Sequence, residues 1–190
     1  MVSAPSLITV DLDNAHYRAL ILEMTREYFY WISGEIHSTI GLTINEILGM
    51  DYEVYLTGML KTFCAGRPPD NIFYLAECDG EAAGMGGLRC LEDGAAEIVR
   101  IYTRPAFRGR GIGTFMVSRL VEDARRIGYH SVRLDTGPFM ISAQRIYKAA
   151  GFESVAPYAG AEPPEVLQPI WLYMEKKLSP ETANPQSQLS

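Results

Sequence analysis

The sequence predicts a mixed α/β fold, with one domain over residues 1–178 and a polar, disordered tail over 179–190. Short apolar runs separated by Asp-Gly turns indicate strands, and segments with apolar residues three and four positions apart indicate helices. Neither an internal repeat nor a shift of composition divides the chain before residue 179. A chain of 190 residues is also long enough to bury a proper core without disulfides or a structural metal.

The composition excludes several classes of protein. No apolar run approaches the roughly 20 residues needed to span a bilayer, and residues 1–6 lack the features of a secretory signal, so we expect a cytoplasmic protein without a membrane partner. The net charge of -6 argues against nucleic acid as a partner. Cys64, Cys78 and Cys90 lack metal-ligand spacing and are odd in number, so we expect no metal, no disulfide framework and three buried thiols.

The first part of the chain predicts a short strand and two helices. Residues 7–10 form the strand, and Asp13 is the expected N-cap of a helix with one apolar stripe. The stripe consists of Tyr17, Leu20, Met24, Tyr28 and Trp31. Residues 43–46 match a capping box, so a second helix is expected to run from there to the chain break at 66–69.

Three antiparallel strands are predicted next. Residues 72–78 and 82–91 flank an Asp-Gly turn and form a hairpin, and a second Asp-Gly turn leads into a strand over 96–103. After Pro105, a glycine-rich loop opens the clearest helix in the chain, which Gly128 ends. A strand over 130–135, a helix over 141–150 and a final strand over 168–177 complete the order.

The loop over residues 108–114 carries the strongest functional signal. Three glycines precede a periodic helix, and the exposed amides and positive end of such a helix can hold phosphates. A P-loop would need Gly-Lys-Ser/Thr at the end of this segment, which is missing. A dinucleotide fingerprint is nearly matched, with Thr114 in place of the third glycine and Asp135 downstream, but that fold would place the loop after its first strand.

At these residues the chain resembles the GNAT family of N-acetyltransferases. The family's Arg/Gln-x-x-Gly-x-Gly/Ala segment is matched by Arg108, Gly111 and Gly113, and its Tyr-x-x-x-Gly-Phe segment by residues 147–152. The resemblance is strongest over 72–155. It implies a mixed, mostly antiparallel sheet that is splayed between the fourth and fifth strands and flanked by helices on both faces, with acetyl-CoA held in the splay.

The resemblance also implies a set of binding residues. Main-chain groups of the fourth strand would bind the pantetheine arm of acetyl-CoA, and the loop would bind its pyrophosphate. Ser142 stands where many members have an asparagine that touches the cofactor. The cofactor-binding residues are therefore expected to be Ile101, Tyr102, Thr103, Arg108, Gly109, Arg110, Gly111, Ile112, Gly113, Thr114 and Ser142.

Acyl transfer to an amine needs a base, an acid and a polarised carbonyl. We expect Glu97 to act as the base through a water molecule, Tyr147 to protonate the departing thiolate as many members do, and the Ile101 amide to polarise the carbonyl. His16, His37 and His130 have no partner at dyad or metal spacing.

The expected function is transfer of an acetyl group from acetyl-CoA to a primary amine of a small molecule, by direct attack in a ternary complex. Residues 1–97 carry 15 acidic against 5 basic side chains, which favours a cationic acceptor. A peptide or protein amine, and a non-catalytic acyl-CoA-binding module, remain alternatives. A homodimer is one state open to the protein, because dimers are common in such families, but the sequence does not determine the oligomeric state.

Overall fold

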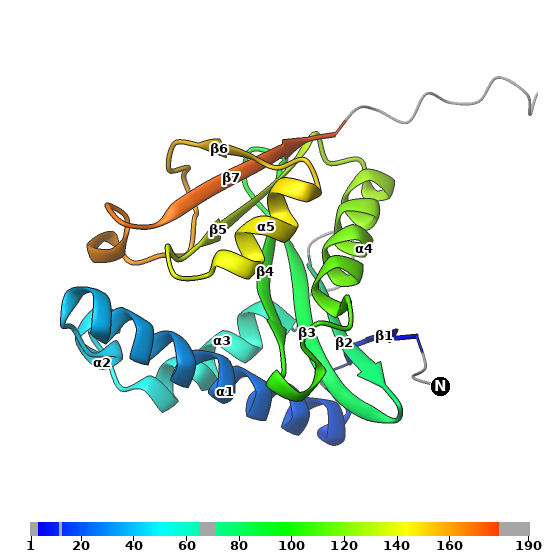
Figure 1. Ribbon diagram of the computed structural model, residues 1–190, viewed down its shortest axis with the longest axis horizontal. Helices are drawn as coiled ribbons and strands as arrows, with labels where there is room; N and C mark the ends of the chain where they lie inside the picture. Colours follow the sequence, from blue (N-terminus) through cyan, green and yellow to red (C-terminus); the bar gives the residue numbers. More distant parts are fainter. Residues whose placement is uncertain (1–3, 12, 65–70, 179–190) are drawn as a thin grey trace, which may run out of the picture.

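The computed structural model describes residues 4–11, 13–64 and 71–178, with only the backbone described over 60–64. Seven strands form one sheet in the order β1-β2-β3-β4-β5-β7-β6, and helices cover both faces (Figure 1). The strands are β1 (Ser6–Thr9), β2 (Asn71–Cys78), β3 (Glu81–Cys90), β4 (Ala96–Thr103), β5 (Ser131–Thr136), β6 (Glu153–Val155) and β7 (Leu172–Lys177). The helices are α1 (Ala15–Ile40), α2 (Ile44–Leu48), α3 (Tyr52–Cys64), α4 (Ile112–Ile127) and α5 (Ile141–Ala149), with short 3₁₀ turns at Pro105–Phe107 and Glu165–Leu167.

The predicted fold class is confirmed, including the splay in the sheet. Every neighbouring pair of strands is antiparallel except β4 and β5, which are parallel. These two strands pair only through Ala96 with Val132 and Glu97 with Arg133. Beyond Glu97 they separate, so one edge of β4 has no partner strand within the described part of the chain. The limits of the predicted domain stay a prediction, because the tail lies outside the described residues.

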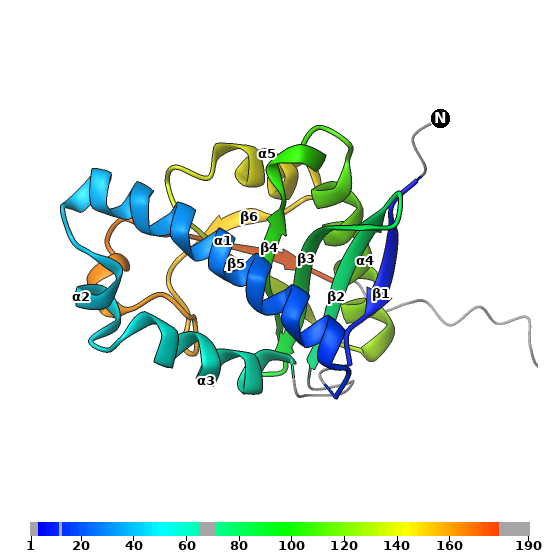
Figure 2. The ribbon, with the colours of Figure 1, turned by 90° about the horizontal axis from the view of Figure 1, so that it is seen from below.

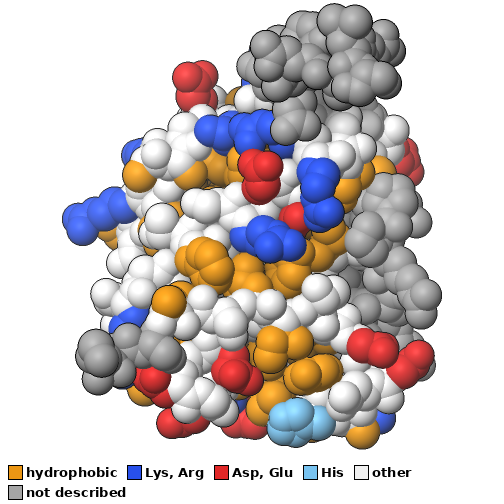
Figure 3. All heavy atoms as spheres, turned by 90° about the vertical axis from the view of Figure 1, so that its right-hand side faces the viewer, with side chains coloured by type: hydrophobic (Ala, Val, Ile, Leu, Met, Phe, Trp, Pro, Cys, Tyr) orange, Lys and Arg blue, Asp and Glu red, His pale blue; other side chains and the backbone are white. Residues whose placement is uncertain are grey.

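Two apolar layers hold the helices against the sheet. On one face, Met116, Leu120 and Ala124 of α4 pack on Ile98, Val132 and their neighbours. On the other face, α1 and α3 lie side by side and pack on β2, β3 and β4 (Figure 2). The arginines of α4 form ion pairs on the surface, as in the contacts of Arg119 and Arg126 with Asp123, and acidic and basic side chains intermingle on that side of the molecule (Figure 3).

The start of α1 differs from the prediction in its cap. Asn14, rather than Asp13, is the N-cap, because its side chain accepts hydrogen bonds from the amides of His16 and Tyr17 at 2.9 and 3.4 Å. The buried stripe also lies to one side of the predicted one. Ile21, Met24, Phe29, Ile32 and Ile36 are buried, whereas Tyr28 and Trp31 are only partly buried. Both side chains line a cavity beside β4.

The second predicted helix is two helices. The capping box at Thr43 and Glu46 is confirmed, but Gly49 has φ 64° and ends α2 after five residues. Asp51 then precedes α3, and its carboxylate accepts hydrogen bonds from the amides of Glu53 and Val54 at 2.9 and 3.3 Å. The predicted break at 66–69 lies outside the described residues.

The end of the sheet holds two further differences. The three-residue strand β6 was not predicted, since a strand this short leaves no periodic pattern in the sequence. The final strand begins at Leu172 rather than at residue 168, because the 3₁₀ turn at Glu165–Leu167 continues into a turn over residues 168–170. Cys78 is buried as expected, but Cys90 is exposed at the end of β3, and the Cys64 side chain lies outside the described residues.

Strand β4 carries a bulge at Arg100. The register with β3 shifts between Met85 and Gly87, so that one extra residue of β4 is accommodated there. Arg100 takes the extra position with φ 57°, a left-handed conformation that is uncommon for a residue with a side chain. As a result Ile98 and Ile101 both pack toward α4, while the Arg100 side chain lies over the ring of Phe29 on α1.

Candidate active site

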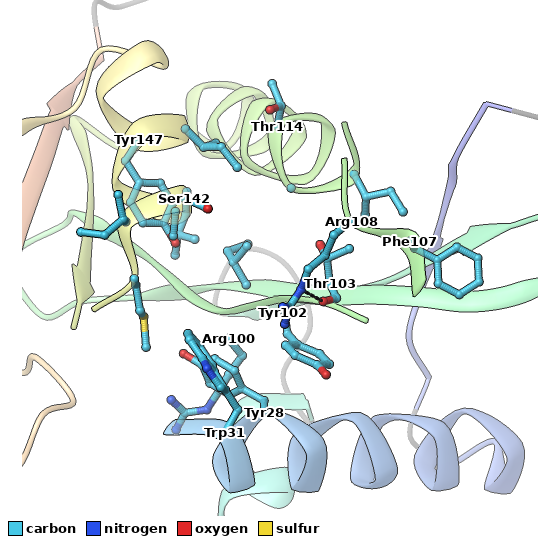
Figure 4. A pocket seen from close by; sticks show the side chains of 18 of the residues that line it. Tyr28, Trp31, Arg100, Tyr102, Thr103, Phe107, Arg108, Thr114, Ser142 and Tyr147 are labelled. Carbon is cyan, nitrogen blue, oxygen red and sulfur yellow. Dashed lines mark hydrogen bonds between the residues drawn. The ribbon is translucent and has the colours of Figure 1, made fainter. Parts of the chain in front are cut away.

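A cavity of about 470 Å³ opens where β4 and β5 separate. Its walls come from the second half of β4, residues 107–114, the end of β5, helix α5 and helix α1 (Figure 4). We call the part beside residues 108–114 the α4 end of the cavity. The part beside Tyr28, Trp31, Arg100 and Asp135 we call the α1 end.

The α4 end is built from main-chain groups. Gly109 and Gly111 both have φ 78°, a conformation that glycine adopts without strain. Gly111 is the N-cap of α4, and the first hydrogen bond of the helix runs from the Phe115 amide to the Gly111 carbonyl at 2.9 Å. The amides of residues 112–114 therefore have no acceptor within the helix. Together with the positive end of the helix dipole, they form a site suited to phosphate groups.

The free edge of β4 turns its main chain toward the cavity. The Arg104 amide donates to Ala83 of β3 at 2.9 Å, and successive main-chain groups of a strand point in opposite directions. Thr103 and Ile101 therefore direct their amides and carbonyls away from β3. Arg108 donates its Nε–H to the Thr103 carbonyl at 3.3 Å (Figure 4). Tyr102 directs its main chain to β3 instead, and its hydroxyl donates to Glu27 at 3.1 Å.

Helix α5 places Tyr147 and Ser142 on the cavity wall. The Tyr147 side chain is buried, and within the described residues its hydroxyl makes no hydrogen bond. Burial raises the pKa of this phenol, so Tyr147 stays protonated and can donate a proton into the cavity. Ser142 is exposed in the first turn of α5 and also lines the cavity.

Glu97 does not lie where the sequence reasoning expected it. Its side chain is fully buried outside the cavity lining. Arg89 forms an ion pair with its Oε2, and the Tyr158 hydroxyl donates to its Oε1 at 2.6 Å. Burial raises the pKa of Glu97, although the charge of Arg89 opposes this. Because both oxygens are engaged away from the cavity, a direct role as the base is inconsistent with this position. The side that Glu97 faces could not be inferred from the sequence.

The predicted binding residues otherwise line the cavity, with one exception. Arg110 lies outside the lining, where its guanidinium packs over Phe107 at 5.1 Å and lies 3.6 Å from Asp79. Of the other arginines, Arg104 binds Glu23 and Glu27, and Arg133 binds Asp93 and Glu175. Arg108 and Arg100 are the arginines of the cavity wall.

Arg100 and Glu162 form an ion pair at the α1 end. Two guanidinium nitrogens of Arg100 donate to the Glu162 carboxylate at 2.7 and 3.1 Å, and a further contact reaches the Tyr55 hydroxyl at 3.2 Å. Burial disfavours the charge of Arg100, but the charges of Glu162, Tyr55, Tyr28 and Asp135 together more than offset this, so the pKa of Arg100 lies above its ordinary value. The sequence shows the arginine-rich stretch, yet nothing in it pairs two residues 62 positions apart.

Asp135 is the second group that the sequence reasoning missed. It lies one residue before the end of β5, at the α1 end of the cavity, and its Oδ1 accepts a hydrogen bond from the Trp171 indole N–H at 2.6 Å. Burial raises its pKa to about 7, and the charges of Glu162 and Glu97 act in the same direction. An acid with this pKa can exchange protons near neutral pH. In the sequence it stands out only as a polar residue near the end of a strand and as the acidic residue downstream of the near dinucleotide fingerprint, and neither pattern indicates a base.

Other kinds of site find less support in the described residues. Across 4–11, 13–64 and 71–178, no three His, Cys, Asp or Glu side chains gather in a way that could hold a metal ion. The helices of that same part are too short or too polar to cross a membrane.

Comparison with protein families identifies the class of protein that this fold and cavity define. Residues 25–152 match the acetyltransferase (GNAT) family. The match spans more than half of the chain, so this protein belongs to the GNAT family, and the resemblance inferred from its motifs is confirmed.

Individual relatives agree with this assignment. An IAA acetyltransferase of Azospirillum brasilense is 31% identical over 111 residues, which cover 58% of this chain and 70% of the relative. An uncharacterized N-acetyltransferase of Schizosaccharomyces pombe is 32% identical over 114 residues, or 59% of this chain and 67% of the relative. Both matches fall short of this chain's full length.

Solved structures share the fold. An acetyltransferase from Streptococcus agalactiae superposes with a TM-score of 0.67 at 15% identity, covering 93% of this chain and 99% of the other. The PaiA N-acetyltransferase from Thermoplasma acidophilum, solved in complex with coenzyme A, gives a TM-score of 0.63 at 17% identity, covering 93% and 100%.

Proposed function

We propose that this protein transfers the acetyl group of acetyl-CoA to a primary amine of a small molecule, by direct attack in a ternary complex. One observation carries the proposal. A single cavity joins the free amides of the α4 N-terminus, the free edge of β4 and the hydroxyl of Tyr147. These are the parts that binding a phosphorylated thioester and protonating its thiolate require.

The residues present fit acetyl-CoA. Residues 108–114 would hold the pyrophosphate, because Gly109 and Gly111 let the main chain approach closely and the amides of 112–114 have no acceptor in the helix. Ile101 and Thr103 would bind the pantetheine arm, as a strand binds an extended peptide. Acetyl-CoA supplies the thioester, whose thiolate leaves readily.

Two groups of the chain then serve the reaction. The Ile101 amide faces the free edge of β4 and would donate to the carbonyl oxygen as negative charge develops on it. Tyr147 would give its hydroxyl proton to the departing sulfur, since burial keeps the phenol protonated. Glu97 takes part in neither step, and we assign it the task of holding Arg89 and the loop that carries Tyr158.

A peptide amine as acceptor and a module that only binds acyl-CoA are the alternatives. The binding module would have no use for an unpartnered, cavity-facing hydroxyl at Tyr147, which favours the enzyme. The α1 end is lined by aromatic rings and by Arg100, which is paired with Glu162, and this favours a small acceptor over a chain.

The test is thiol release from acetyl-CoA with a panel of amines, together with calorimetry of coenzyme A binding. Amine-dependent release is the expected result. Tight binding without release on any small amine or peptide would support the binding module. Absence of binding would overturn the assignment of residues 108–114.

A further inference from the structure

The α1 end of the cavity carries features that bear on the identity of the acceptor. It lies across the free edge of β4 from the α4 end and is lined by Tyr28, Trp31, Arg100, Asp135 and Phe139. A smaller cavity of about 70 Å³ adjoins it, sharing Tyr28, Arg100 and Asp135. If the cofactor occupies the α4 end, the acceptor has to approach from here.

Among the described residues, the charges of the α1 end leave no cation available to a carboxylate. The Arg100 guanidinium is engaged with both oxygens of Glu162, with the Tyr55 hydroxyl and with the Met59 sulfur at 3.2 Å. Since Glu162 cancels the charge of Arg100, ionised Asp135 leaves the α1 end net negative. An ammonium group suits such an environment, whereas a carboxylate would be buried without a counter-charge.

Asp135 has an oxygen free to receive a proton. Trp171 holds Oδ1 at 2.6 Å, while Oδ2 accepts no hydrogen bond from the described residues. The side chain is partly exposed, on the cavity wall that also carries Tyr147. Asp135 is also close enough to Tyr147 for its charge to contribute to the raised pKa of that phenol.

Aromatic rings line up along the same end. Tyr28 contacts Trp31 with ring centroids 6.4 Å apart, Trp31 meets Phe139 edge-on at 5.8 Å, and Phe139 meets Trp171 edge-on at 5.8 Å. Such a wall favours a flat apolar body and attracts a cation over the ring faces. The partial exposure of Tyr28 and Trp31 is explained if these rings contact a ligand.

We propose that the α1 end binds a primary arylalkylamine as its ammonium ion, with no carboxylate beside the nitrogen, and that Asp135 takes the proton of this ammonium. The inference rests on the proposed acetyl transfer and names its acceptor class and its base.

The steps balance in atoms and protons. Asp135 Oδ2 takes one proton from the ammonium, and the freed lone pair forms the bond from nitrogen to the carbonyl carbon. The carbon–sulfur bond breaks with its electron pair on sulfur, which takes the Tyr147 proton. The nitrogen then loses a second proton to the Tyr147 phenolate, which restores the neutral hydroxyl. Asp135 releases its proton to solvent, so amide, thiol and one proton are the products.

The groups facing Asp135 explain why it titrates near neutrality. Burial in the cavity wall raises its pKa to about 7, and the charges of Glu162 and Glu97 raise it as well, whereas Trp171 and Arg100 lower it. The phenols that face it are those of Tyr28, Tyr55, Tyr147, Tyr158 and Tyr173. Binding of an ammonium favours the ionised form, which is the form that accepts the proton.

Three related amines test the acceptor class with the full-length chain and saturating acetyl-CoA. Phenethylamine and phenylalanine amide have no carboxylate, while phenylalanine has one. We expect kcat/KM for phenylalanine to be about 100-fold lower than for its amide, because a carboxylate would be buried without a partner. Equal rates for phenylalanine and its amide, or a preference for aspartate over phenethylamine, would overturn the acceptor class.

Asp135→Asn tests the base. The amide retains the hydrogen bond from Trp171 but takes no proton, so kcat with phenethylamine should fall by about 100-fold or more. Asp93→Asn is the matched control, because Asp93 lies at a surface turn outside the cavity. Coenzyme A affinity, measured by calorimetry, should be the same in both variants and the wild type. A kcat unchanged in Asp135→Asn would remove Asp135 as the base.

Trp171→Phe tests the ionisation of Asp135 through the pH dependence of kcat/KM, which would not change if Asp135 had only a structural role. It keeps a ring but removes the hydrogen bond that stabilises the Asp135 carboxylate, so the acid limb of the kcat/KM profile should shift to higher pH. An acid limb at the same pH in Trp171→Phe and the wild type would contradict the assignment of Asp135 as the base.

If the wild type binds coenzyme A but acetylates only carboxylate-bearing amines, the proposed acceptor class is wrong while the proposed acetyl transfer stands. If it acetylates no amine, the proposed function fails.

Discussion

The two ends of the cavity are built from different parts of the polypeptide. At the α4 end, the groups available to a ligand are main-chain amides of residues 112–114 and the free edge of β4. At the α1 end they are side chains that meet from distant segments, such as Arg100 with Glu162 and Asp135 with Trp171. A main-chain site needs glycines and a helix start in the right order, whereas a side-chain site depends on how the whole chain folds.

This difference separates what is general from what is particular to this protein. Amides at a helix start donate hydrogen bonds to any phosphate, and a strand edge binds any extended arm with suitable polar groups. The charge balance and ring geometry of the α1 end are specific to these side chains. Donor binding should therefore be insensitive to changes at the α1 end, and acceptor choice should depend on it.

The largest expected effect comes from Tyr147, which lines the cavity from helix α5. Tyr147→Phe removes the proton that the departing sulfur takes, so kcat should fall by roughly 10² to 10⁴-fold while coenzyme A affinity is retained. Steady-state kinetics and calorimetry measure the two quantities. Tyr30→Phe is the matched control, since that side chain is 85% exposed. Equal turnover by Tyr147→Phe and the wild type would remove this residue from the mechanism.

The second prediction concerns stability at the α1 end. Glu162→Gln leaves the guanidinium of Arg100 buried without its neutralising partner, which should lower the free energy of unfolding by about 3 kcal/mol. Glu165→Gln makes the same chemical change at an exposed position three residues on and should have almost no effect. Chemical denaturation of both variants checks this, and similar midpoints for the two would show that the ion pair does not stabilise the fold.

The third prediction follows from the raised pKa of Asp135. Its folded pKa is about 7, above the ordinary value of 3.8, so the folded state binds the proton more tightly than the unfolded state. The resulting stabilisation is complete below the unfolded value and is lost as pH rises through 7. Between pH 5 and 7 the wild type should lose about 2 kcal/mol that Asp135→Asn retains. Parallel pH dependence of thermal unfolding in the two proteins would contradict the assigned pKa.

The smallest effect is expected at the α4 end. Arg108 is exposed, so Arg108→Ala should raise the Kd for coenzyme A by about 5-fold at low salt and by less at high salt. Arg125→Ala serves as the control, because Arg125 binds Glu122 on the surface of α4. Calorimetry at two salt concentrations distinguishes the variants. An identical Kd for both would confine phosphate binding to the main chain.

The features predicted correctly from the sequence are those with local causes. The capping box at Thr43, the turn at Asp79 and Gly80 and the start of α4 at Gly111 each follow from residues a few positions apart. The splay between β4 and β5 was implied by resemblance, because its cause lies in the pairing of strands that are distant in sequence.

The incorrect or missing predictions share a different cause. Glu97 and Asp135 are both acidic residues on strands, and the sequence does not show which of them faces the cavity. The structure turns Glu97 toward Arg89 and Tyr158 and places Asp135 on the cavity wall. Tyr28 and Trp31 appeared to be packing residues because aromatic side chains at helical spacing usually are.

The bulge at Arg100 makes the length of β4 as important as its composition. Adding or removing one residue in a strand exchanges the two faces for every residue beyond it. Here the extra residue lets Ile101 pack toward α4 and Tyr102 toward α1 while the edge between them stays free. Loss of a single codon in this stretch would exchange those positions, even if every remaining side chain were kept. The extra residue at Arg100 therefore determines which face of the sheet each later residue of β4 occupies.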